Sequence, residues 1–208
     1  MIQYREMEYQ KWFEEREEDW YKNDRVFLND YAVSNLKVYV GWVVRIYWEK
    51  YGHDKVKILE PGCRMGEAGA AIAQMFSPDD VVYEGMEISK KLIADSRTYH
   101  NRSFYGDICN CPELISESYD IVFSRTLFGF LRDIPAAVKN MIRLARRVTI
   151  MVQPTPVVMG VHHYASMDNL DDLRDVLKGF NYSIMPSIPV YDRYGRSVFG
   201  EQILIVEK

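Results

Sequence analysis

Cysteine is scarce in this 208-residue sequence, which has only Cys63, Cys109 and Cys111. An odd, small number of cysteines argues against a disulfide framework and favours a reducing compartment. Cys109 and Cys111 form a C-x-C pair, but no further Cys or His lies near enough in sequence to complete the four ligands of a structural zinc site. We therefore expect no bound metal.

Long apolar runs and an excess of basic charge are also missing. No stretch reaches the roughly 18 uninterrupted apolar residues that a membrane span needs, and the opening sequence MIQYREMEYQ is charged where a signal peptide would be apolar. A net charge of -4 and a pI of about 5.6 predict no general attraction to nucleic acid or to an anionic membrane. These absences predict a soluble cytoplasmic protein with neither nucleic acid nor membrane as partner.

Proline is absent before Gly52, whereas all four tryptophans and 13 of the 28 aromatic residues precede this glycine. Residues 4–25 and 29–51 have helical composition or spacing, and Gly52 is typical of a helix C-terminus. We therefore expect a helical extension over 1–52 before a domain over 53–208. Residues 29–51 fit a helix packed on a sheet edge, whereas residues 4–25, acidic and aromatic together, fit either a lid or a homodimer contact.

From Lys55 onward, short β-rich runs alternate with helical segments. The expected strands are 56–59, 81–86, 103–105, 119–123 and 148–152, and the expected helices are 66–75, 90–99, 112–116, 134–145 and 169–180. Two final runs, 182–191 and 202–206, read as a hairpin. Unbroken apolar runs such as 119–123 predict strands that are buried on both faces, so we expect an α/β fold with a parallel sheet.

The segment KVKILEPGCRMGEAGAAIAQMF, residues 55–76, carries the strongest chemical signal. A β-rich run ends at Glu60, turns at Gly62, and opens an alanine-rich helix after Gly66. Glycine permits a positive φ and close approach of a ligand, and the start of a helix presents unpaired N–H groups. This place in an α/β sheet is where ligands bind. A plain strand-turn-helix and a nicotinamide site are the alternatives, but the G-x-G-x-x-G spacing of the latter is not met.

This segment resembles the first motif of the class I S-adenosylmethionine-dependent methyltransferases, acidic-x-Gly-x-Gly-x-Gly. The motif stands here as Glu60-Pro61-Gly62-Cys63-Arg64-Met65-Gly66. The resemblance implies that S-adenosyl-L-methionine binds here, with contacts from Glu60, Gly62, Cys63, Arg64 and Gly66. Arg64 occupies the family's usual middle glycine. Three placements of its side chain stay open: facing away from the ligand, clamping the cofactor carboxylate, or filling the methionine pocket.

Two later segments extend the resemblance. Residues 82–89, VYEGMEIS, are similar to the family's second strand, which implies that Glu87 accepts hydrogen bonds from both ribose hydroxyls and that Ile88, next to it, also binds the cofactor. In the segment SFYGDI, the resemblance places Asp107 at the adenine amino group and Ile108 against the ring. A solvated surface charge at Glu87 and a turn residue at Asp107 are the simpler alternatives.

Residues 119–133 look like the family's fourth strand and the loop after it. There we expect Ser124 to contact the cofactor, and Arg125 either to bind an acidic acceptor or to pair with a surface carboxylate. Many small-molecule members have a His in this loop, and this chain does not. The remaining candidates for a general base are His162 and His163, which could equally be exposed or cap local backbone.

The resemblance covers about residues 50–208. It implies a three-layer Rossmann-like α/β fold, with a seven-stranded, mostly parallel sheet, a C-terminal antiparallel hairpin and preceding N-terminal helices. The function it implies is in-line methyl transfer to a small-molecule acceptor, with S-adenosyl-L-homocysteine as product. Two alternatives stay open: a degenerate methyltransferase fold used as a binding or scaffold subunit, and an aminopropyltransferase-like enzyme.

Overall fold

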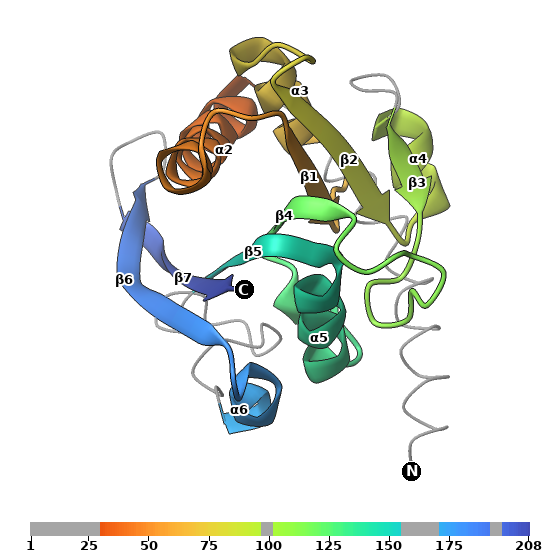
Figure 1. The fold of residues 1–208 in the computed structure, drawn as a ribbon. Coiled ribbons are helices and arrows are strands. Elements are labelled where there is room, and N and C mark those ends of the chain that lie inside the picture. The colour runs from red at the N-terminus through yellow and green to blue at the C-terminus, as the bar shows by residue number, and fades with distance from the viewer. Residues whose placement is uncertain (1–29, 97–101, 155–170, 192–196) are drawn as a thin grey trace. The chain divides into compact units, whose positions relative to one another are not determined.

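The computed structural model describes residues 30–96, 102–154, 171–191 and 197–208. Its helices are α2 (Asp30–Tyr51), α3 (Glu67–Met75), α4 (Lys90–Ser96), the 3-10 turn η1 (Phe128–Phe130), α5 (Ile134–Leu144) and α6 (Asp171–Leu177), as Figure 1 shows. Its strands are β1 (Val56–Pro61), β2 (Val81–Glu87), β3 (Ser103–Tyr105), β4 (Tyr119–Arg125), β5 (Ala145–Pro154), β6 (Asn181–Tyr191) and β7 (Ser197–Glu207). The helix expected over 4–25 lies outside the described residues.

The seven strands form one sheet in the order β3-β2-β1-β4-β5-β7-β6. The pairs β2–β3, β1–β4 and β4–β5 are parallel, whereas β5–β7 and β6–β7 are antiparallel. This confirms the predicted Rossmann-like α/β fold and its C-terminal antiparallel hairpin. Every residue of β4 before Arg125 is buried, so this strand is covered on both faces.

One compact unit contains the chain up to Val56 and the segment Cys63–Gly106. Within it, α2 packs on α3. The packing of this segment on a sheet edge stays a prediction. The indole of Trp48 stacks on His53 at 4.2 Å between ring centroids and meets the edge of Phe76 at 5.6 Å. Val43 and Tyr47, two of the apolar positions at helical spacing in α2, are buried. A separate extension ending at residue 52 stays a prediction.

The other unit contains Lys57–Gly62 and Asp107–Lys208. Its helix α5 packs beside β4 and β5 (Figure 1). The side chain of Asp133 caps the start of α5 by accepting a hydrogen bond from the Ala136 N–H at 2.9 Å. The apolar face of the helix, which includes Ala137, Val138 and Met141, is fully buried.

Asp120 fastens the amino-terminal ends of the central strands in this unit. It is 7% exposed, and its Oδ2 accepts a hydrogen bond from the backbone N–H of Lys57 on β1 at 2.9 Å. Its Oδ1 pairs with Nη1 of Arg146 on β5, also at 2.9 Å. The ammonium of Lys57 lies 4.5 Å from the ring centroid of Tyr119. These contacts connect β1, β4 and β5 at the amino-terminal ends of the strands, opposite their carboxyl ends.

Residues 112–116 form turns and not the short helix that we expected. Pro112 starts this stretch, and the guanidinium of Arg143 on α5 donates to the Leu114 carbonyl at 2.6 Å. A backbone paired in this way has no need of helical hydrogen bonds. None of the helices in the described segments is long and apolar enough to cross a membrane.

Candidate functional site

The buried carboxylate of Glu87 organises the end of β2. Its Oε1 accepts hydrogen bonds from the backbone N–H groups of Ile88 at 2.8 Å and Ser89 at 3.0 Å. Its Oε2 accepts one from the N–H of Arg64 at 3.0 Å. An ionised carboxylate has about four acceptor positions, so three backbone donors leave roughly one for a ligand. Glu87, Ile88 and Arg64, all predicted from the sequence, are therefore brought together.

Burial raises the pKa of the Glu87 carboxyl above its usual value, because the charged form loses solvation. The three backbone N–H groups and the positive charge of Arg64 lower this pKa and offset part of the effect. The side chain is only 6% exposed. A solvated surface charge, the simpler alternative for Glu87, does not describe this environment.

The turn before α3 follows a left-handed backbone path. Gly62, Arg64 and Gly66 have φ values of 70°, 50° and 82°. The N–H of Cys63 donates to the Met86 carbonyl of β2 at 3.2 Å, and the N–H of Gly66 donates to the Cys63 carbonyl at 2.8 Å. Glycine adopts such φ values without strain, whereas Arg64 pays a steric cost. Arg64 thus adopts a backbone conformation that favours glycine, and its side chain is exposed.

The predicted adenine segment carries an ion pair. Asp107 Oδ2 lies 2.9 Å from Nη2 of Arg132, and its Oδ1 accepts a hydrogen bond from the N–H of Cys109 at 2.8 Å. Ile108 is buried, and its carbonyl accepts from Nδ2 of Asn140 on α5 at 2.8 Å. The loop bearing Asp107 and Ile108 is therefore held in place by side chains that follow β4.

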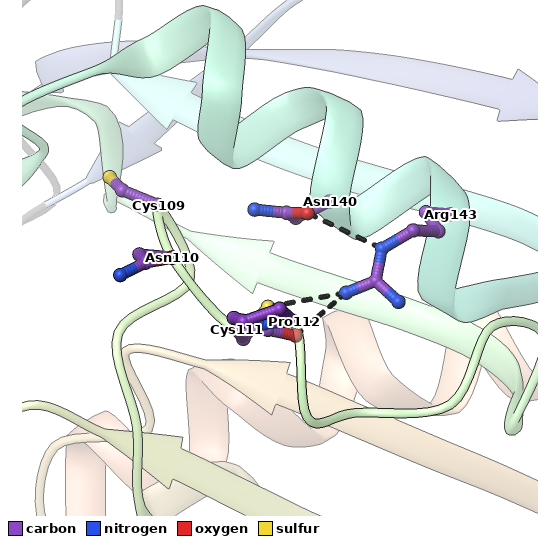
Figure 2. Close-up of a pocket in the computed structure, with 6 residues that line it drawn as sticks. All are labelled: Cys109, Asn110, Cys111, Pro112, Asn140 and Arg143. Atoms are coloured by element: carbon purple, nitrogen blue, oxygen red, sulfur yellow. Dashed lines mark hydrogen bonds between the residues drawn. The ribbon is translucent and has the colours of Figure 1, made fainter.

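Figure 2 shows an open pocket of about 340 Å³ behind this loop, lined by Cys109, Asn110, Cys111, Pro112, Asn140 and Arg143. The Arg143 guanidinium donates to the Cys111 carbonyl at 2.8 Å, and its Nε donates to Asn140 Oδ1 at 3.4 Å. These donors bind the protein itself. Burial raises the pKa of the Cys109 thiol to about 11, so little thiolate forms at neutral pH. The side chains of Arg143 and Asn140 that line the pocket therefore hold the loop in place.

The carboxyl ends of β1 and β4 hold the other predicted residues. Glu60 is 6% exposed and Ser124 is fully buried, whereas Arg125 is half-buried as the last residue of β4. A Cβ atom on Gly62 would lie 2.6 Å from Cδ1 of Leu127. Glycine at position 62 thus permits the chain after β4 to approach the end of β1.

Sequence reasoning missed Gln153, Arg132 and Asn140. Gln153 is 1% exposed near the end of β5. In the sequence, the only sign of its role was the position of this amide between an apolar run and a proline. Arg132 and Asn140 act through long-range contacts that carry no local pattern. His162 and His163 lie outside the described residues. Within the described segments, no three Cys, His, Asp or Glu side chains come together in a way that could hold a metal ion.

The comparisons with known proteins bear on this site. A family model described as a methyltransferase domain matches residues 59–152. No curated protein matches the sequence. Among solved structures, the plantazolicin methyltransferase BamL, in complex with a triazolic desmethylPZN analogue and S-adenosylhomocysteine, has a TM-score of 0.70 and 14% identity, and the match covers 99% of this chain and 96% of that one.

Two further structures share the fold. Magnesium protoporphyrin IX methyltransferase (ChlM) from Synechocystis PCC 6803, with bound S-adenosylmethionine, has a TM-score of 0.56 and 18% identity over 83% of this chain and 79% of that one. The CurJ carbon methyltransferase has a TM-score of 0.63 and 13% identity over 87% of this chain, which spans 56% of that longer chain. Residues 59–152 therefore match a methyltransferase-domain model, and the chain has the fold of S-adenosylmethionine-dependent methyltransferases of known structure.

Proposed function

We propose that the protein is a cytoplasmic S-adenosylmethionine-dependent methyltransferase that acts on a small-molecule acceptor. The observation that carries the proposal is the pairing of the buried Glu87 carboxylate with the N–H of Arg64, at 3.0 Å, beside the left-handed turn. A carboxylate buried at the end of a strand, with acceptor capacity left over, suits a ligand that presents hydroxyl groups.

The residues around Glu87 and Asp107 fit different parts of the cofactor. Glu87 Oε2 carries one backbone bond and keeps room for a ribose hydroxyl. A second hydroxyl bound at Oε1 would share that oxygen with the N–H groups of Ile88 and Ser89. Asp107 would accept from the adenine amino group beside its existing bond to Arg132, and Ile108 would pack on the ring.

When bound, the cofactor would supply a methyl group on a sulfonium; the acceptor would take this methyl group in line, and the thioether of S-adenosylhomocysteine would be the leaving group. The chain contributes alignment of acceptor and methyl group and exclusion of water. A general base is needed only when the acceptor arrives protonated. We propose His162 or His163 for that role, and Arg125 for pairing with an acidic acceptor. A small-molecule acceptor agrees with neighbours that are named for plantazolicin and magnesium protoporphyrin IX.

Calorimetric titration with S-adenosylmethionine, S-adenosylhomocysteine and decarboxylated S-adenosylmethionine tests the proposal. We expect the first two to bind and the third to bind more weakly. Absence of binding by all three would favour the scaffold alternative, and preference for the third would favour the aminopropyltransferase. Transfer of a labelled methyl group from S-adenosylmethionine to acceptors of a small-molecule extract then tests catalysis. We also propose that the N-terminal helices form a homodimer contact. Light scattering, which measures the molar mass in solution, tests it.

A further inference from the structure

Two buried polar side chains near the carboxyl ends of β4 and β5 have atoms without a hydrogen-bond partner. They are Ser124, whose side chain is fully buried, and Gln153, which is 1% exposed. Within the described part of the chain, neither the Ser124 hydroxyl oxygen nor Gln153 Nε2 makes a hydrogen bond. A buried donor left without a partner costs free energy, and folded proteins keep few of them. Two such groups on neighbouring strands therefore require an explanation.

The orientation of the Gln153 carboxamide is fixed. Its Oε1 accepts a hydrogen bond from the backbone N–H of Phe128 at 3.1 Å. An N–H donor can pair only with the oxygen of an amide, so this contact identifies the other end as the NH₂ group. Gln153 thus holds two N–H donors in a dry environment, where a hydrogen bond to an incoming oxygen is strongest.

Both side chains lie on one face of the sheet. Ser124 on β4 pairs in register with Met151 on β5, and Gln153 follows Met151 by two residues. Residues in register across parallel strands share a face, as do residues i and i+2 of one strand. Thr149 lies on the same face, and its hydroxyl is paired with the Met141 carbonyl of α5 at 3.4 Å. A paired hydroxyl and an unpaired one are therefore available for comparison on a single face.

The chain beside this pair is strained. Thr126 has a φ of 55°, an unfavourable value for a β-branched residue, while its N–H donates to the Val152 carbonyl at 2.7 Å. Strain of this kind gathers at ligand sites. Because Ser124 and Gln153 are buried, a ligand reaches them only when a neighbouring part of the chain shifts. The segment from Thr126 to Phe128 is such a neighbour, since Phe128 donates to Gln153, and a strained segment requires less energy to shift.

We propose that Ser124 and Gln153 form a subsite that binds an oxygen atom of a ligand, a carboxylate or carbonyl, through the Gln153 NH₂ group and the Ser124 hydroxyl. The proposal deepens the function proposed above and rests on it. The oxygen can come from two sources that present the same chemistry: the carboxylate of the cofactor's methionine part or a carboxylate of the methyl acceptor. Gln153 thereby joins the site as a specificity-determining residue.

The first test uses thermal unfolding without ligand. Ser124→Ala removes an unpaired buried hydroxyl and is expected to raise Tm by about 2 °C. Thr149→Val, the matched control, removes a paired hydroxyl and is expected to lower Tm by about 2–4 °C. A fall in Tm for Ser124→Ala as large as that for Thr149→Val would overturn the proposal, because it would show that the Ser124 hydroxyl is already paired, with protein or with a buried water.

The second test compares ligands in wild type, Ser124→Ala, Gln153→Glu and Thr149→Val. Gln153→Glu keeps the acceptor for the Phe128 N–H and replaces the NH₂ donor with an oxygen. The probes are S-adenosylhomocysteine, 5′-methylthioadenosine, which lacks the carboxylate, and benzoate added to the S-adenosylhomocysteine complex. If the cofactor is the source, Ser124→Ala and Gln153→Glu weaken the binding of S-adenosylhomocysteine at least about fivefold. Both variants leave the binding of 5′-methylthioadenosine unchanged.

If the acceptor is the source, both nucleosides bind all four proteins equally, and benzoate raises Tm only in wild type and Thr149→Val. Equal weakening of both nucleosides would overturn the proposal, because it would place the effect on adenosine. No difference between the variants with any probe would overturn it as well. Failure of wild type to bind either nucleoside contradicts the proposed function instead, and the Tm comparison of Ser124→Ala with Thr149→Val still tests the pair.

Discussion

The backbone N–H of Arg64 points at the carboxylate of Glu87, with 3.0 Å between nitrogen and Oε2. The two residues lie 23 positions apart in sequence. Their contact requires the left-handed backbone at Arg64, which turns its N–H toward the end of β2. The arginine that departs from the family motif thus supports, through its backbone, the residue expected to bind ribose.

Glu87→Ala is expected to weaken S-adenosylhomocysteine binding by about 1–3 kcal/mol, because a hydrogen bond to a charged group is lost. Calorimetry on the folded variant measures the change. Glu84→Ala, on the same strand, is the control and should bind as wild type does. A dissociation constant unchanged by Glu87→Ala would remove Glu87 from the site.

The raised pKa of Glu87 predicts opposite effects of pH on stability and binding. The folded protein holds this proton more tightly than the unfolded chain, so the contribution of Glu87 to the free energy of unfolding is largest below about pH 4.5 and falls as pH rises through the raised pKa. Binding of S-adenosylhomocysteine needs the carboxylate and should weaken as pH falls through the same range. Titrations with S-adenosylhomocysteine at a series of pH values should show this loss of affinity in wild type. If the loss persists in Glu87→Gln, it belongs to another group.

Asp107→Ala is expected to cost less binding energy than Glu87→Ala and to reduce the preference for adenine over hypoxanthine. Part of the Asp107 carboxylate is already engaged by Arg132 and by the N–H of Cys109. Competition between S-adenosylhomocysteine and its inosine analogue gives the preference. Arg132→Ala, which breaks the ion pair but keeps the acceptor, is the control. Equal discrimination by wild type and Asp107→Ala would make Asp107 a turn residue only.

Arg64→Gly is expected to leave S-adenosylhomocysteine affinity within a factor of about three, since exposed side chains usually contribute about 0.5 kcal/mol or less. Relief of the left-handed strain is offset by the greater freedom of glycine in the unfolded chain, so stability should change by under about 1 kcal/mol. Arg64→Ala removes the charge and keeps the strain. Weakening of about 1.5 kcal/mol or more in both variants would show a clamp on the cofactor carboxylate, and a large gain of binding would show a blocked pocket.

Gly62→Ala is expected to lower the free energy of unfolding by about 1–3 kcal/mol, because alanine is strained at a φ of 70° and its Cβ would meet Leu127. Denaturant unfolding measures the loss. Combining it with Leu127→Val separates the two causes: the shorter side chain relieves the contact and not the strain. If the double variant is no more stable than expected from adding the two single losses, the contact with Leu127 contributes nothing.

The sequence was sufficient for the fold because β-rich runs alternate with helical segments from Lys55 onward. The ends of the strands were less accessible: β1 continues through Pro61 and β5 starts at Ala145, since sheet hydrogen bonding extends past the apolar residues. Glu87 could be identified because its role is tied to a local motif. Gln153 could not, because its importance depends on a hydrogen bond from Phe128, 25 residues away in sequence, and on complete burial.

Asp120 offers a way to change the lifetime of the protein without touching its site. Its contacts with Lys57 and Arg146 lie at the amino-terminal ends of the strands, opposite their carboxyl ends. Asp120→Asn keeps the shape of the side chain and loses its charge. It therefore weakens the contacts through which Asp120 connects β1 and β5, with no direct effect on cofactor binding. In a cell such a substitution would act as a temperature-sensitive allele, folded when cool and cleared by proteolysis when warm, with which loss of the protein could be timed.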